Sequence, residues 1–181
     1  MPMRRAARTA APGLLLFALA AVPPAAATVP AAAPLELRYA VHVGGLHLLD
    51  LTVEGRLLDG GYELSGEAAT RGFVDWFTPL RSRFSAAGRL EPDGGARPQR
   101  YRSDRSWRGR ERTVTLAYDG AAVVEAVHPP AARAEREPVP DPLKPGTLDP
   151  LSAGLSAMIG VFRHGRCAGT ERVFDGMARS D

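Results

Sequence analysis

Alternation of apolar and polar residues is the feature of this sequence that most constrains its fold. In residues 35–43, LELRYAVHV, every second residue is aliphatic or aromatic and most residues between them are polar. The same period of two runs through residues 46–58 and 62–70. This is the period of a β-strand that buries one face. We therefore expect three consecutive antiparallel strands, joined by the glycine turns at 44–45 and 59–61.

The alternation resumes after the first eighty residues and continues for four more segments. These segments are 81–91, 99–107, 112–118 and 121–127. Glycine-rich stretches such as PDGGARP separate them. Seven short strands with such connections predict a mainly β fold: one curled antiparallel meander, resembling a half-barrel.

One segment has the period of a helix instead. In TLDPLSAGLSAMIGVF, Asp149 can cap the helix and Pro150 suits its first position. Apolar residues then recur at helical spacing: Leu151, Leu155, Met158, Ile159 and Phe162. The opposite side consists of small residues, so burial on most sides is expected. We predict one α-helix near 149–162 that plugs the inside of the curled sheet.

The beginning of the chain has the pattern of an export signal. Three arginines are followed by an apolar run from Ala10 to Val22 and then by small residues. That run is about 13 residues long, whereas a membrane span needs roughly 20. We expect a signal peptide at 1–27, with cleavage after Ala33 as an alternative, a spacer at 28–34 and a single domain at 35–181. The mature protein should be periplasmic, without a transmembrane segment.

The charge of the mature chain argues against a nucleic-acid partner. After residue 27 the chain carries equal numbers of basic and acidic residues, 20 of each. A protein with no net positive charge is a poor nucleic-acid binder. The charge is uneven, however, because residues 70–112 carry a net charge of +6. This part either forms solvated strand faces or meets a phosphate or a lipid headgroup.

Motifs for catalysis or metal binding are not evident. The chain has no G-x-S-x-G, no H-E-x-x-H, and no glycine-rich phosphate loop. His42 and His47 flank one turn without a third ligand nearby, and Asp149 and Asp175 fit capping and turn positions better than acid–base work. We therefore expect a protein that is not an enzyme and has neither a metal site nor a cofactor.

Cys167 is the single cysteine of the chain. It has three interpretations: a small buried apolar residue, a redox-active thiol, or half of a disulfide whose partner lies beyond residue 181.

The segment GFVDWFTPLRSRF, residues 72–84, contains the densest group of aromatic residues. A glycine and a proline interrupt the strand pattern there, which predicts a short helical turn near 73–78. Phe73, Trp76, Phe77 and Leu80 would share one face of it. That face either closes one end of the sheet, forms the rim of a cavity for an acyl chain, or docks a partner. For the acyl-chain hypothesis we place Arg71, Arg81 and Arg83 at the cavity mouth.

Several spaced blocks resemble an exported bacterial family known as domain of unknown function 3108. The blocks are YAVHVGGLHLLDLTVEG, GFVDWFTPLRSRFSAAGRL, RYRSDRSWRGRERTVTLAYDG, GTLDPLSAGL and RVFDG. The resemblance covers residues 35–176 and implies an envelope context but no catalytic residues. Members are similar in outline to periplasmic lipoprotein carriers, whose open half-barrels shelter acyl chains, although fold does not fix function. The family pattern continues beyond the point where this chain ends, which indicates a truncated or frame-shifted member.

Our first hypothesis is a non-enzymatic periplasmic protein that binds or shuttles an apolar, lipid-like ligand or supports envelope assembly. The residues expected to line its cavity are Phe73, Trp76, Phe77, Leu80, Leu155, Met158, Ile159 and Phe162. The alternative is a structural or docking module. In that case the arginine-rich stretch from Arg100 to Arg112 would bind an anionic envelope polymer or a protein.

Overall fold

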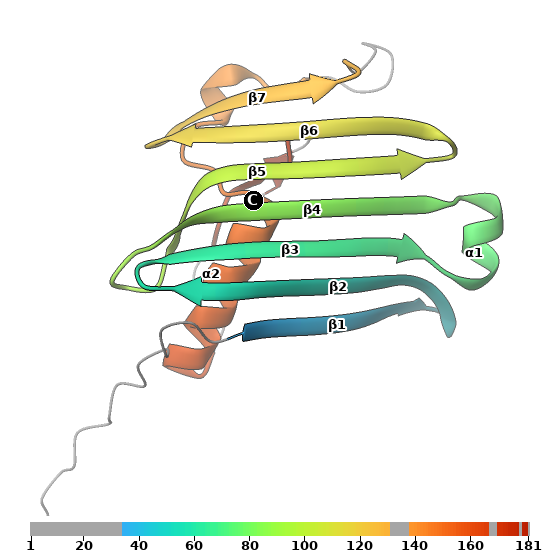
Figure 1. Ribbon diagram of the computed structural model, residues 1–181, viewed down its shortest axis with the longest axis horizontal. Helices are drawn as coiled ribbons and strands as arrows, with labels where there is room; N and C mark the ends of the chain where they lie inside the picture. The colour runs from blue at the N-terminus through green and yellow to red at the C-terminus, as the bar shows by residue number, and fades with distance from the viewer. Residues whose placement is uncertain (1–33, 131–137, 167–169, 178, 181) are drawn as a thin grey trace, which may run out of the picture.

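The computed structural model of the protein describes residues 34–130, 138–166, 170–177 and 179–180. Seven antiparallel strands form one sheet in their sequence order (Figure 1). They are β1 (Pro34–Val43), β2 (Leu46–Leu58), β3 (Gly61–Thr70), β4 (Leu80–Leu90), β5 (Ala96–Trp107), β6 (Arg110–Asp119) and β7 (Ala122–His128). β1 and β7 are the two edges, so the sheet is open. The predicted meander of seven strands is confirmed.

Helix α2 (Pro150–His164) crosses one face of this sheet (Figure 1). We call this face the inner face and the opposite one the outer face. The short helix α1 (Gly72–Phe77) connects β3 to β4, and a 3-10 helix, η1 (Asp141–Leu143), precedes α2. The two-residue strand β8 (Val173–Phe174) pairs with β9 (Arg179–Ser180). The predicted packing helix is therefore confirmed. The expected signal peptide, most of the spacer and Cys167 lie outside the described residues.

The start of α2 is fastened to the sheet by a buried chain of hydrogen bonds. The Asp149 carboxylate accepts bonds from the backbone N–H groups of Leu151 and Ser152, both at 3.0 Å, so Asp149 is the predicted N-cap. The Ser152 hydroxyl donates to Asp149 and lies 2.6 Å from the hydroxyl of Tyr62 on β3. All three side chains are buried, and burial raises the pKa of both Asp149 and Tyr62.

The hydrophobic core lies between the sheet and α2. Tyr62, Leu64, Tyr101 and Leu116 contribute to it from the inner face, and Leu155, Ile159 and Phe174 cover them. β2 has 13 residues, so it extends about 40 Å, whereas a helix is only about 10–12 Å wide. One helix cannot cover such strands from end to end. The inner face toward α1 therefore stays open.

The β1 strand shows where the cover of α2 ends. Leu35 and Leu37 are half-buried, whereas Tyr39 and Val41 point to the same side and are exposed. The alternation thus continues at least as far as Val41, although the burial ends at Leu37.

Of the three interpretations of the apolar face of α1, the structure contradicts the first, that this face closes the end of the sheet. None of its residues is buried, and Trp76 at its outer side is 80% exposed. The reason is the polar residue Asp75, which faces the sheet. Its carboxylate accepts hydrogen bonds from Thr70, at 2.8 Å, and from Arg81, at 2.6 and 3.0 Å. These bonds turn the aromatic side of α1 outward.

Replacing Lys144, the single lysine of the chain, by methionine should destabilise the fold. Its ammonium group is largely buried between the carboxylates of Glu125 at 2.9 Å and Asp141 at 2.8 Å. Burial alone would lower the pKa of Lys144, but the two carboxylates outweigh it and raise the pKa. Lys144→Met leaves the carboxylate of Glu125 on β7 without its cationic partner. We expect the free energy of unfolding, measured in urea, to fall by about 2–4 kcal/mol.

The matched control is Arg38→Met, which removes an exposed ion pair with Glu36. An exposed pair contributes about 0–1 kcal/mol. If the two variants lost equal stability, the buried pair would not be what holds the 140–148 segment to β7.

Candidate functional site

A cavity of about 620 Å³ lies between the inner face and α2, beside the hydrophobic core. Its walls are mainly apolar. The sheet contributes Leu37, Leu51, Leu64 and Phe84, and α2 contributes Leu151, Gly154, Leu155 and Met158. Ligand cavities in proteins typically measure about 300–1,000 Å³ and have such apolar walls with few polar groups. This is therefore the candidate functional site.

The register of the strands explains why there is space here. One row of paired residues crosses the inner face from β1 to β6: Tyr39, Leu51, Ala68, Ser82, Arg105 and Arg112. The middle of this row consists of the small residues Ala68 and Ser82. In the next row the ring of Phe84 lies against Gly66, where an added Cβ atom would be 2.3 Å from the ring. Small side chains in the floor leave a hollow that α2 roofs over.

The same row changes chemistry from one side of the cavity to the other. On β1 and β2 it is apolar, with Tyr39 and Leu51, and on β5 and β6 it is cationic, with Arg105 and Arg112. Ser82 and Ser103 are buried between these two ends. Burial raises the pKa of the neighbouring Tyr101, so this phenol remains neutral. An elongated molecule with one apolar and one anionic end matches this gradient.

Two charged residues line the cavity, the cation Arg105 and the carboxylate Asp175. The exposed guanidinium of Arg105 forms no ion pair or hydrogen bond with the residues that the structure describes, in contrast to several other arginines. Arg71 binds Asp50 at 2.6 Å, for example, and Arg83 binds Glu67 at 2.9 Å. Arg105 can therefore bind an anionic group without first breaking an internal ion pair.

Comparison with known proteins places the chain in a family. The model of DUF3108, described as a protein of unknown function, matches residues 38–181. The chain belongs to the DUF3108 family. No curated protein and no solved structure matches this DUF3108 protein.

The predicted lining residues of this DUF3108 protein divide into two groups. Leu80, Leu155 and Met158 do line the cavity. The other five do not: Ile159 is in the core, Phe162 is exposed on α2, and Phe73, Trp76 and Phe77 are exposed on α1. The walls that the sequence did not single out come from β1, β2 and β3. The alternation of apolar residues in each strand indicates which face of the sheet these residues lie on. It does not indicate where along that face a cavity lies.

The three arginines predicted for the mouth lie elsewhere as well. Arg71, Arg81 and Arg83 each bind a carboxylate, and none lines the cavity. Arg105 occupies that position instead. In the sequence, Arg105 alternates with Tyr101 and Ser103, which indicates that Arg105 faces inward with them.

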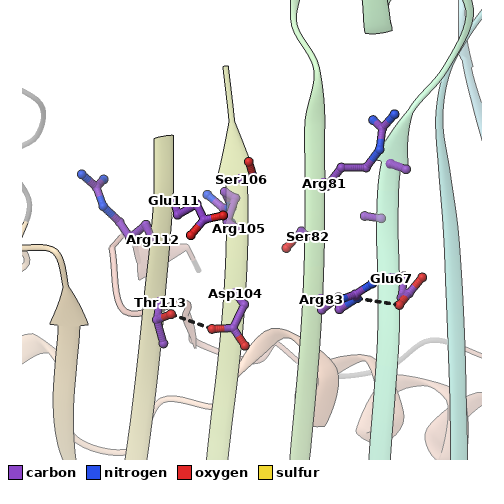
Figure 2. Close-up of a pocket in the computed structure, with 12 residues that line it drawn as sticks. Glu67, Arg81, Ser82, Arg83, Asp104, Arg105, Ser106, Glu111, Arg112 and Thr113 are labelled. Carbon is purple, nitrogen blue, oxygen red and sulfur yellow. Dashed lines mark hydrogen bonds and ion pairs between the residues drawn. The ribbon is translucent and has the colours of Figure 1, made fainter. Parts of the chain in front are cut away.

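The outer face has a separate, polar hollow of about 350 Å³ (Figure 2). Figure 2 shows side chains of opposite charge along it, with Arg83 bound to Glu67 and Thr113 donating to Asp104. Asp104 also binds Arg102, at 2.7 Å. The predicted arginine-rich stretch is thus divided, because Arg100 and Arg102 face outward whereas Arg105 faces inward. Such neutral pairs offer little attraction to an anionic polymer.

The two histidines of the first turn do come together. The rings of His42 and His47 stack at 4.8 Å, and His47 bonds to Asp50 at 2.7 Å. In the described ranges, no group of three or more histidine, cysteine, aspartate or glutamate residues could hold a metal ion. Among those same residues, no helix is long and apolar enough to cross a membrane.

Proposed function

We propose that this DUF3108 protein is a non-enzymatic binding protein for a lipid-like molecule with an apolar chain and an anionic end. The observation that carries the proposal is the cavity of about 620 Å³ with apolar walls and Arg105 at one end. The apolar chain would lie between α2 and strands β1–β4. The anionic end would lie at β5, beside Ser82, Ser103 and Arg105.

The energetics favour such a ligand. Each methylene group moved out of water contributes about 0.8 kcal/mol, so about ten buried methylenes contribute about 8 kcal/mol. Loss of ligand freedom and desolvation of the anionic end reduce this sum. Because about 8 kcal/mol corresponds to a dissociation constant of about 1 μM, the losses place the expected dissociation constant above about 1 μM. Such weak binding suits a molecule that is carried and released. We further propose that this happens in the periplasm, after cleavage of the signal peptide.

Titration with a fluorescent fatty acid tests the proposal. The mature protein should bind one molecule, and an unlabelled fatty acid should displace the probe. A fluorescence signal that does not saturate, or that no unlabelled fatty acid displaces, would sink the proposal.

The Arg105→Gln variant tests the orientation of the ligand. It should weaken binding of a fatty acid by about tenfold, since one charge-assisted hydrogen bond contributes about 1.5–3 kcal/mol. Binding of the fatty alcohol of equal chain length should not change. Arg83→Gln is the matched control, because Arg83 is an arginine of the same sheet that faces outward. Equal weakening of acid and alcohol would show that Arg105 does not bind the anionic end.

A further inference from the structure

One end of the sheet gathers exposed apolar side chains on three separate connections. This end, which we call the α1 end, consists of the β1–β2 turn, α1 and the β5–β6 turn, on the right of Figure 1. Its exposed large apolar residues are Val43, Leu46, Phe73, Trp76, Phe77 and Trp107. Water-exposed apolar groups that cluster in this way mark a binding surface.

The aromatic side chains of α1 are held in this exposed position. The Asp75 carboxylate binds Arg81 and Thr70 on the side toward the sheet, as described above. On the other side, the ring of Phe77 packs against Phe73 at 4.6 Å and against Trp76 at 5.3 Å between ring centres. The three rings thus form one apolar cluster on a fixed support. Fixed orientation reduces the entropy that binding would cost.

The surroundings of this cluster are basic. Arg108 lies over the ring of Trp107 at 5.5 Å and reaches Thr78 at the end of α1 at 3.4 Å. Arg110 follows in the same turn. The nearby carboxylates of Asp50 and Asp75 are neutralised by Arg71 and Arg81. Arg108, which contacts a ring and a hydroxyl group rather than a carboxylate, therefore adds positive charge beside the aromatic cluster.

The shape of the α1 end distinguishes a membrane from a protein as its partner. Phe73, Trp76 and Phe77 line neither the cavity, nor the hollow on the outer face, nor a third hollow that adjoins the cavity on the inner face. They protrude, and so offer no pocket for a side chain of a partner protein. Tryptophan and phenylalanine with adjacent arginines suit the interface of a bilayer, where rings enter the headgroup layer and arginines meet phosphates. We propose that the α1 end docks on the surface of a membrane rich in anionic phospholipid.

This surface is connected to the cavity. A hollow of about 540 Å³ on the inner face extends to Trp107 and Arg110, and Leu80 and Arg105 line both this hollow and the cavity. Docking at the α1 end would place the cavity entrance beside the lipid headgroups. The proposal extends the proposed function by naming the source of the ligand, but its evidence is the exposed surface alone.

Vesicle flotation tests this proposal with the mature chain. The protein should float with vesicles of phosphatidylcholine and phosphatidylglycerol, but only weakly with phosphatidylcholine alone. Added salt should weaken binding because it screens the arginines. The triple variant Phe73→Ser, Trp76→Ser, Phe77→Ser should lose at least tenfold in affinity for the anionic vesicles. Its unfolding midpoint should stay near that of the wild type, because all three side chains are exposed.

The control is Phe162→Ser, because Phe162 is as exposed as Phe73 but lies on α2 near the β4–β5 turn, at the opposite end of the strands. It should float like the wild type. Absence of wild-type binding to anionic vesicles, or equal binding by the triple variant, would overturn the proposal. The proposal would also be overturned if the wild type formed a dimer without binding vesicles and the triple variant were a monomer. The aromatic cluster would then join two copies of the chain. Fatty-acid uptake by the triple variant should remain normal, which separates this test from that of the cavity.

Discussion

Replacing Gly154 by phenylalanine should abolish fatty-acid uptake without unfolding the protein. Gly154 lies on α2 and lines the cavity, and a Cβ atom at this position would meet nothing within 4 Å. A phenylalanine ring can therefore enter the space that the ligand would occupy. We expect at least a tenfold loss of affinity, equal to about 1.4 kcal/mol. Glycine also costs about 0.5–1 kcal/mol inside a helix, so stability should not fall.

Gly160 provides a matched control for this substitution. It belongs to the same helix and also has open space around its Cβ position, but it does not line the cavity. Gly160→Phe should bind the fatty acid like the wild type. The fluorescence titration described above measures both variants. Equal binding by Gly154→Phe and Gly160→Phe would contradict the assignment of the ligand to this cavity.

Asp149→Ala should cause a large loss of stability. The substitution removes the N-cap of α2 and leaves the buried hydroxyl of Ser152, which also bonds to Tyr62, without its acceptor. Loss of a cap costs about 1 kcal/mol and an unsatisfied buried group about 1–3 kcal/mol. We expect a decrease of about 2–4 kcal/mol in urea unfolding. Since Asp149 places α2 over the cavity, fatty-acid affinity should fall as well.

Asp149→Asn separates the cap from the charge. Asparagine is also a good N-cap, so this variant should be more stable than Asp149→Ala. In the wild type, burial raises the pKa of Asp149 above 3.8, so the folded state holds this proton to higher pH than the unfolded state does. Stability from this group is therefore lost as pH rises from about 3.8 through the folded pKa.

The Asn variant should lack that loss. Unfolding of the two proteins by urea at a series of pH values measures the difference. An unchanged pH dependence in Asp149→Asn would show that Asp149 does not titrate abnormally.

The strands and α2 could be predicted because local sequence determines them. The alternation around Leu64 determines which residues share one face of the strand, whatever the length of the sheet. Asp149 followed by proline is a local signal for the start of a helix. No local pattern in the sequence indicates how much of the inner face α2 covers. Tyr39 and Leu35 share one alternation, yet one is exposed and the other half-buried, since the lengths of strand and helix decide it.

The site was predictable only in part for the same reason. The helical period of α2 predicted that Leu155 and Met158 face the sheet, and the structure places them in the cavity wall. The period of α1 grouped Phe73 with Trp76 but could not tell whether they face inward. Asp75 decides that, through bonds to Thr70 on β3 and Arg81 on β4. The position of Arg105 beside Ser82 in the cavity wall depends on the register between β4 and β5, which the sequence alone does not reveal.

Native mass spectrometry of the mature protein, purified from cells without detergent, tests the central claim most directly. We expect a protein ion that carries one lipid-like molecule, identified by its mass after gentle dissociation. We also expect that Gly154→Phe, prepared in the same way, carries none, whereas Gly160→Phe retains it. Bare wild-type protein that also fails to take up an added fatty acid would contradict the account.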